Sequence, residues 1–397
     1  MNRRMGWEAI AGVGGGAISR EAQKNLEKGE ELCRKRKPDK ALPYLMKAME
    51  GGNNLDACVQ LAFLMPNVDM SIDLLRNAEA KGRENLLRIF GPRCFDDSGD
   101  HVGHFWGILE TRPYMRVLQA KVRIYIEAKQ FANAAETIIE MLRLCPGDNL
   151  GQRDSLGSVL LKAGRPADAL SFIQTWLQPE TMRTGEPPER GGCVFKIPFK
   201  TPLSPERAEA LGEYCKADMA YSGALAAYKL WGDCELARQY LRVGARQNSY
   251  VLVKVLAKVE QPRNLNNTPR QQNGPEDAHD YLWLAQDLWM APDVWAWADG
   301  DAEAKAFTLR ICCRKSCGKR EDKPALFKRC GGCKEAIYCS QACQKLDWPA
   351  HRRGCKESQQ MKEIQRAMWL GKPLPKTDIP VVSAEFTPNG IVSTFYD

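Results

Sequence analysis

Apolar residues recur three and four positions apart along most of the chain before residue 300, a spacing that places them on one face of an α-helix. Leu118, Val122 and Tyr125 follow this rule, and so do Ala134 and Ile138. Runs that alternate apolar and polar side chains, as half-buried strands do, are hard to find. The pattern therefore predicts a mainly α fold, with helices over residues 20–177 and again over 206–300.

One helical segment returns 30 residues later in the chain. Residues 41–48, with the sequence ALPYLMKA, correspond to residues 71–78, with the sequence SIDLLRNA, and Gly52 corresponds to Gly82. Such a period is typical of stacked helical hairpins, each of which needs a neighbour to bury its apolar face. We expect a helical-repeat array in which adjacent hairpins share a core.

Residues 115–146 and 150–176 resemble two tetratricopeptide repeats. The packing positions of that repeat are matched by Leu118, Val122, Tyr125, Phe131, Ala134, Ile138 and Pro146 in the first unit, and by Gly157, Leu160, Gly164, Ala169 and Ile173 in the second. The first unit departs from the family at Val122, where a small residue is usual, and at Lys129, where glycine is usual. The pair at 41–48 and 71–78 looks more like Sel1-type repeats. The resemblance implies a tetratricopeptide-like array with a groove for a partner segment.

Composition divides the rest of the chain. Residues 1–19 contain a glycine run but no following Lys-Ser or Lys-Thr, so we expect a flexible N-terminal arm and no phosphate-binding loop. Residues 178–205 are rich in proline and glycine and read as a linker or insertion. The four tryptophans between residues 283 and 297 favour a cap on the array, and residues 357–397 read as a C-terminal tail.

Eight cysteines and one histidine fall between residues 312 and 355. Two to four residues separate the members of each pair, which lets one turn present both side chains to one metal ion. Eight ligands fill two tetrahedral zinc sites and leave no position open, as in structural zinc sites. The candidate ligands are Cys312, Cys317, Cys330, Cys333, Cys339, Cys343, His351 and Cys355, with Cys313 as the alternative to Cys312.

This stretch resembles a MYND-type zinc finger. The residues that fit that family's pattern are Cys330, Cys333, Tyr338, Cys339, Cys343, Trp348, Pro349, His351 and Cys355. The first pair departs from the usual spacing of two, because Cys312 leaves four residues before Cys317 and Cys313 leaves three. The resemblance implies two structural Zn²⁺ ions in a cross-braced arrangement. One would be held by Cys312, Cys317, Cys339 and Cys343, and the other by Cys330, Cys333, His351 and Cys355.

The residues between the ligands suggest local structure. Gly331 and Gly332 suit a tight turn with a positive φ. Ser340 suits the cap of a short helix that carries Cys343, and Pro349 suits the first turn of a second helix.

Positive charge is concentrated in this module. Residues 310–356 hold 13 Lys and Arg against four Asp and Glu, a net charge of +9, whereas the whole chain carries +8. Clustered cations on a zinc finger can neutralise nucleic-acid phosphates, so a nucleic-acid-associated transcriptional regulator is one alternative. The module lacks the long recognition helix of groove-reading fingers, which argues against it.

The chain shows none of the marks of a secreted or membrane protein. Its 15 cysteines are an odd number, and no apolar signal segment follows Met1. We expect an intracellular protein, cytoplasmic or nuclear, without membrane contact.

We expect an adaptor and not an enzyme. The MYND resemblance implies binding of short proline-containing peptides in a pocket near Tyr338, Gln344 and Trp348, with packing of Trp348 over the second zinc site as the alternative role of that side chain. Pro373-Leu374-Pro375 is a candidate to occupy that pocket in cis. A SET-type lysine methyltransferase is a weaker alternative, because such enzymes need an Asn-His pair and none of the four histidines follows Asn. No catalytic residues, small-molecule substrate or organic cofactor are expected.

Overall fold

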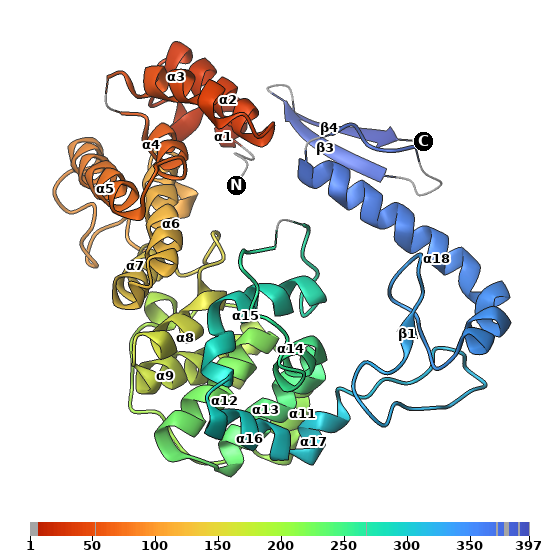
Figure 1. The fold of residues 1–397 in the computed structure, drawn as a ribbon. Coiled ribbons are helices and arrows are strands. Elements are labelled where there is room, and N and C mark those ends of the chain that lie inside the picture. The colour runs from red at the N-terminus through yellow and green to blue at the C-terminus, as the bar shows by residue number, and fades with distance from the viewer. Residues whose placement is uncertain are drawn as a thin grey trace. The chain divides into compact units, whose positions relative to one another are not determined.

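The fold is described from a computed structural model, which describes residues 7–397 apart from 52, 267, 371, 377–380, 388–389 and 397. The chain forms two compact units, Met1–Pro198 with Phe386–Ile391, and Phe199–Glu385 with Val392–Asp397. Helices dominate both units (Figure 1), so the prediction of a mainly α array followed by a small metal-binding region is confirmed. Across the described residues, none of the helices combines the length and apolar character needed to cross a membrane.

The first unit is built of helices that, from α2 to α10, each pack on the next along the chain. Its α-helices are α1 Trp7–Ala11, α2 Arg20–Arg34, α3 Pro38–Met49, α4 Leu55–Ala62, α5 Val68–Phe90, α6 Arg112–Glu127, α7 Phe131–Leu144, α8 Arg153–Lys162, α9 Pro166–Trp176 and α10 Pro179–Thr184. Three short 3-10 helices accompany them, η1 Val13–Gly15, η2 Phe105–Gly107 and η3 Glu189–Gly192.

The same turn joins three of these helix pairs. Arg36, Lys129 and Gly164 adopt left-handed backbone conformations with φ of 56°, 58° and 75°. The next amide donates to the carbonyl five residues earlier in each turn, at 2.9 Å, 2.8 Å and 2.9 Å. Lys129 takes this conformation without being glycine, at a cost of about 1–2 kcal/mol. The hairpins are therefore regular, while their assignment as tetratricopeptide or Sel1-type repeats stays a prediction.

The 30-residue period also has a structural counterpart. Ala41, Leu45 and Ala48 are buried on α3, and Ser71, Leu75 and Ala78 are buried at the same positions of α5. Gly82 lies against the side chains of Leu55 and Tyr114, because a Cβ built on it would stand 2.8 Å and 2.9 Å from their carbon atoms. Gly52 lies outside the described residues.

Residues 7–19 are not the flexible arm that the glycine run predicted. They form α1 and η1, and Glu8 is 1% exposed. Its carboxylate accepts hydrogen bonds of 3.0 Å and 2.7 Å from Arg116, whose guanidinium also donates twice to Asp56 at 2.6 Å and 2.7 Å. A paired buried charge fixes this segment, and glycine supplies the positive φ of 58° that the turn requires at Gly14.

The second unit begins with a further group of helices. These are α11 Pro205–Glu213, α12 Ala217–Trp231, α13 Glu235–Gln247, α14 Ser249–Leu256, α15 Pro275–Trp289, α16 Pro292–Gly300 and α17 Ala302–Ala306. Trp289 is fully buried and stacks on Trp297 with centroids 6.5 Å apart and an interplanar angle of 11°. Two of the four clustered tryptophans thus belong to the core and are not open to a ligand.

A small metal-binding region follows, which we call the finger (residues 310–356). Strands β1 Lys328–Arg329 and β2 Ile337–Tyr338 pair antiparallel, with Lys328 opposite Tyr338 and Arg329 opposite Ile337. Helix α18 Gln341–Leu370 comes next, and β3 Val381–Thr387 pairs with β4 Gly390–Tyr396 near the end of the chain.

Helix α18 replaces the two short helices expected on either side of Pro349. Proline removes one amide donor but leaves the helix continuous. Candidate ligands Cys343, His351 and Cys355 lie on both sides of it and tie the two halves to the same small region.

Candidate metal centre

The eight predicted ligands form two separate clusters. Cys312, Cys317, Cys339 and Cys343 form the first, and Cys330, Cys333, His351 and Cys355 form the second, with the ligand atoms of each cluster within 4.8 Å of one another. These are the two ligand sets that the cross-braced arrangement implies.

The distances within each cluster fit zinc. In the first, the Sγ atoms of Cys317, Cys339 and Cys343 lie 3.5–3.6 Å apart. In the second, the Sγ atoms of Cys330 and Cys355 are 3.8 Å apart, and Cys333 Sγ lies 3.5 Å from His351 Nε2. A tetrahedral site with metal–sulfur bonds of about 2.3 Å has edges of about 3.8 Å. Each cluster therefore fits one structural Zn²⁺, and four protein ligands leave no coordination position for a substrate.

Short elements place the ligands. The turn between β1 and β2 carries Cys330 and Cys333, and Cys339 follows β2 directly. Ser340 Oγ accepts from the amide of Cys343 at 3.2 Å, so the predicted cap exists at the start of α18. Further along α18, His351 and Cys355 are one helical turn apart and share a face.

The structure distinguishes between the two neighbouring cysteines at the first ligand position. Cys312 is buried in the first cluster, whereas Cys313 is exposed and lies outside it. The amide of Cys313 donates to the carbonyl of Ile337 at 2.8 Å, and the amide of Ile337 lies 3.2 Å from Cys313 Sγ. Successive side chains on an extended backbone point in opposite directions, so only one of the two can face the metal.

Polar side chains outside the ligand sets support the sulfur atoms. The side-chain amide of Gln359 donates to Cys355 Sγ at 3.3 Å, and Arg314 donates to Cys343 Sγ at 3.6 Å. A Cβ on Gly332 would stand 3.0 Å from Cys355 Sγ, which explains a glycine there. Neither Gly331 nor Gly332 has the expected positive φ, which belongs to Lys334 at 61°.

In each cluster these contacts favour the thiolate form of one ligand, whereas burial and hydrogen bonds with Cys343 and Cys317 raise the pKa of Cys339 to about 12, and burial raises that of Cys355. Burial raises the pKa of Cys330, but hydrogen bonds from His351 and from the backbone amides of Gly332 and Cys333 outweigh it and lower that pKa to about 6. A hydrogen bond with Cys339 lowers the pKa of Cys343 to about 7, and burial opposes this. Thiolate is the form that binds zinc.

Two supporting residues were missed from the sequence. Glu321 is buried, and its carboxylate accepts from the amides of Arg310 at 2.9 Å and Phe327 at 2.6 Å, which fixes the loop between them. Its signal in the sequence is that Glu321 and Asp322 are the only acids between residues 310 and 334. Gln359 could have been found by its position one helical turn beyond Cys355.

The predicted peptide pocket is only partly available. Tyr338 is 1% exposed, and its hydroxyl donates to Asp347 at 2.7 Å, so its ring is not a free surface. Trp348 is 42% exposed, with its ring edge-on to His351 at 5.9 Å. Gln344 is half-buried and lies one turn before Trp348 on α18.

The Pro373-Leu374-Pro375 segment does not occupy that surface. It borders a pocket of 290 Å³ at the other end of α18, lined by Glu363, Arg366, Ala367, Leu370, Lys372, Pro373 and Pro375. About 33 Å of helix separates Trp348 from Leu370 at 1.5 Å per residue. The expected self-capping in cis is therefore wrong, because α18 continues as a helix and carries the segment away.

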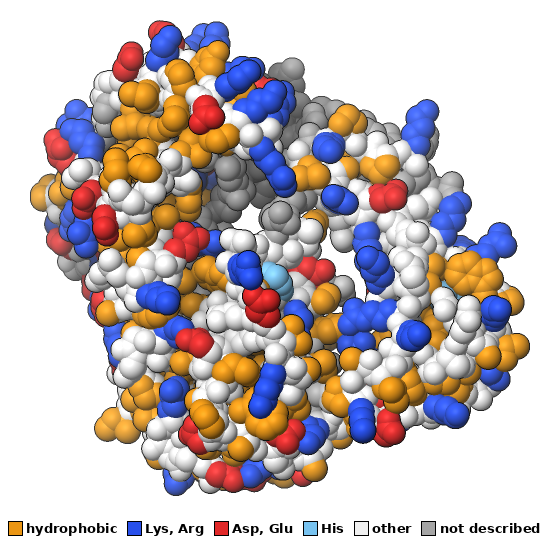
Figure 2. Space-filling model, viewed as in Figure 1, with side chains coloured by type: hydrophobic (Ala, Val, Ile, Leu, Met, Phe, Trp, Pro, Cys, Tyr) orange, Lys and Arg blue, Asp and Glu red, His pale blue; other side chains and the backbone are white. Residues whose placement is uncertain are grey.

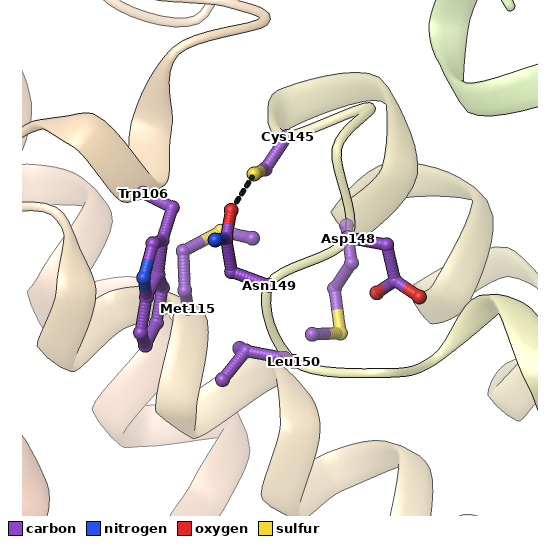
Figure 3. A pocket seen from close by; sticks show the side chains of 7 residues that line it. Trp106, Met115, Cys145, Asp148, Asn149 and Leu150 are labelled. Atoms are coloured by element: carbon purple, nitrogen blue, oxygen red, sulfur yellow. Dashed lines mark hydrogen bonds between the residues drawn. The ribbon is translucent and has the colours of Figure 1, made fainter. Parts of the chain in front are cut away.

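A second pocket, in the first unit, has no room for a ligand. Figure 3 shows Trp106, Met115, Cys145, Asp148, Asn149 and Leu150 around it, and Cys145 Sγ lies 3.3 Å from Asn149 Oδ1. Its volume of 10 Å³ is at the limit for one water molecule. Asp148 caps α8 by accepting from the amides of Gln152 and Arg153, both at 2.8 Å, so this polar cluster has a structural role.

Comparisons with known proteins agree with this geometry. The family model described as MYND finger matches residues 312–355. The MYND-type zinc finger protein MUB1 of Saccharomyces cerevisiae is 33% identical over 93 residues, which cover 20% of this chain and 15% of that protein. The F-box protein At1g67340 of Arabidopsis thaliana is 41% identical over 56 residues, 14% of this chain and 15% of that protein.

The SET domain and MYND-type zinc finger protein 6 of Schizosaccharomyces pombe is 39% identical over 49 residues, 12% of this chain and 10% of that protein. The chain thus spans no more than about a sixth of these relatives. No solved structure matches. The ligand clusters and the family match together identify residues 312–355 as a MYND finger that fits two structural zinc ions.

Proposed function

We propose that this protein is a non-enzymatic adaptor, which binds proline-containing peptides of other proteins through the MYND finger and a second partner through its helices. The observation that carries the proposal is the exposure of Trp348 beside His351, a ligand of the second closed metal cluster. A MYND finger is a protein-interaction module, which supports a protein-binding role.

The surface around Trp348 has the chemistry that a proline-containing peptide requires. Such a peptide is extended before it binds, so it loses little entropy on docking, and it packs its rings on an aromatic side chain. His351 lies behind the indole ring, and as a metal ligand it is held in place. Gln344, one turn earlier, offers an amide to a peptide carbonyl.

Closed coordination supports the absence of catalysis at the metal. Catalytic zinc keeps one position for water or substrate, whereas both clusters here supply four protein ligands. The relative with a SET domain in its name matches this chain over 49 residues only. The similarity therefore supports a shared MYND finger and gives no support for a shared enzymatic activity.

The test uses the zinc-loaded full chain and a fluorescein-labelled peptide with a Pro-Leu-Pro core. Fluorescence anisotropy should show binding that Trp348→Ala weakens at least about tenfold, since an exposed aromatic anchor is a typical hot spot. Leu346→Ala is the matched control, because Leu346 is 66% exposed on the same helix and should leave binding unchanged. A Trp348→Ala variant that retains its zinc and binds normally would contradict the proposal.

A further inference from the structure

Two arginines contact one tyrosine where the finger meets the helices of the second unit, and a lysine lies on the same helix as that tyrosine. The guanidinium carbons of Arg310 and Arg329 lie 5.1 Å and 4.9 Å from the ring centroid of Tyr250 on α14. Lys254 lies one turn beyond Tyr250 on the same helix. Residues about 60 to 80 positions apart in the chain thus build one cationic cluster (Lys254, Arg310 and Arg329).

This cationic cluster is not neutralised within the described part of the chain, where none of its three side chains forms a salt bridge. Glu321 lies near Arg310, but it is buried, and its carboxylate accepts hydrogen bonds from the backbone amides of Arg310 and Phe327. Burial lowers the pKa of Lys254 and the charge of Arg329 lowers it further, with Glu276 opposing both. The charged form of Lys254 is thus destabilised, and an anion bound beside it would stabilise that form.

The surrounding surface has the same sign. Arg320 pairs with Ile311, the residue that follows Arg310 in the chain. Lys328 directly precedes Arg329. Figure 2 shows Lys and Arg side chains spread over the finger with few Asp and Glu among them. The metal does not remove this surplus, because seven thiolates and two Zn²⁺ carry −3 together, which leaves about +6 of the finger's +9.

We propose that Lys254, Arg310 and Arg329 bind a phosphorylated side chain of a partner protein. A phosphoryl group carries about −1.5 to −2 charges and three strong acceptor oxygens, which suits three converging donors. A carboxylate is satisfied by one guanidinium fork and would leave the other two cations unpaired. The inference deepens the proposed function, on which it rests, by adding a second determinant to the peptide that the adaptor recognises.

A nucleic acid fits this cluster less well. Single strands bind to grooves that combine cations with free aromatic faces on which bases stack. The ring of Tyr250 already contacts two guanidinium groups, so it offers little surface to a base. Two guanidinium groups on one ring, with a lysine one helical turn away, suit a single dense anion better than an extended row of phosphates.

The test scans a phosphoserine through the positions that flank a Pro-Leu-Pro core in fluorescein-labelled peptides. Binding to the zinc-loaded full chain is followed by anisotropy, beside peptides with serine or glutamate at the same positions and beside oligothymidylate. Phosphoserine at a restricted set of positions should tighten binding about tenfold, the gain expected of charged hydrogen bonds. Lys254→Met and Arg329→Gln should each remove this gain and leave binding of the serine peptide unchanged.

Lys254→Met keeps an unbranched apolar side chain at this position on α14 and removes the charge. Lys229→Met, at an exposed lysine on α12, is the matched control and should keep the full gain. Zinc content and helical circular dichroism confirm that each variant is folded.

The failures of the two proposals are distinguishable. Core-dependent binding without any gain from phosphoserine, an equal gain from glutamate, or tighter binding of oligothymidylate would overturn the phosphate site and leave the adaptor in place. A set of phosphoserine peptides in which alanines replace the Pro-Leu-Pro core tests whether the phosphate site binds without that core. Lys254-dependent binding of these phosphoserine peptides, with no effect of the core, would support the phosphate site and sink the Pro-Leu-Pro proposal. No binding by any peptide would reject both.

Discussion

The side-chain amide of Gln359 donates to Cys355 Sγ at 3.3 Å, one helical turn along α18 from that zinc ligand. Hydrogen bonds to a coordinating sulfur orient it and balance its charge, and their loss typically costs 10–100-fold in metal affinity. We expect Gln359→Ala to lower zinc affinity at the second cluster about tenfold. Competition with a chromogenic chelator measures this, with Gln341→Ala at the exposed start of α18 as the control. Equal affinities for the two variants would show that the hydrogen bond has no influence on the metal.

The first ligand position gives a sharper test, because its two candidates are adjacent. Cys312→Ser removes a sulfur from the first cluster, so the bound zinc should fall from two ions per chain toward one. Cys313→Ser should retain both ions, since Cys313 lies outside the clusters. Elemental analysis of the purified variants decides between them, and the opposite ranking would exchange their roles.

In the first unit, Arg116 holds two buried carboxylates, those of Glu8 and Asp56. Arg116→Met should destabilise this unit by about 3–5 kcal/mol, because it leaves both acids without their partner. Arg123→Met removes an exposed pair with Glu127 and should cost less than about 0.5 kcal/mol. Urea denaturation followed by circular dichroism compares the two, and similar losses would mean that the buried network contributes little.

Asp148 makes stability depend on pH. Burial raises its pKa from 3.8 to about 6, although the amides of Arg153 and Gln152 oppose this. The folded state therefore binds a proton more readily than the unfolded state, so this group contributes stability at low pH that is lost as pH rises through about 6.

When the pH falls from 7 to 5, the free energy of unfolding of the wild type should therefore rise by roughly 1–2 kcal/mol relative to that of Asp148→Asn. Loss of zinc at low pH affects both proteins and cancels in the comparison. Asp39→Asn, at an exposed position, should show no such change. A pH-independent difference between wild type and Asp148→Asn would contradict the shifted pKa.

Local patterns explain which features were predictable. The ligand pairs were visible because two to four residues separate their members, and the helices because their apolar faces repeat within one turn. The contact of Glu8 with Arg116 joins residues 108 positions apart, and no local signal marks it. The glycine run accordingly suggested mobility, although its turn is fixed by that distant partner.

The structure of α18 differs from the sequence prediction for a related reason. Proline at position 349 is a good helix start by local preference, yet α18 continues through it. Ligands on both sides hold the helix together, and this long-range constraint outweighs one missing hydrogen bond. The Pro373-Leu374-Pro375 segment was misplaced as a consequence, since its distance from Trp348 depends on that continuity.

Helix α18 contributes Cys343 to one metal cluster and both His351 and Cys355 to the other. The first zinc ion to bind therefore orders the backbone that carries ligands for the second, so part of the entropy cost of the second site has already been met. We therefore expect metal uptake to be cooperative, so that at limiting zinc the protein divides into molecules that hold two ions and molecules that hold none. Availability of the metal then acts on this finger as a threshold and not as a graded signal.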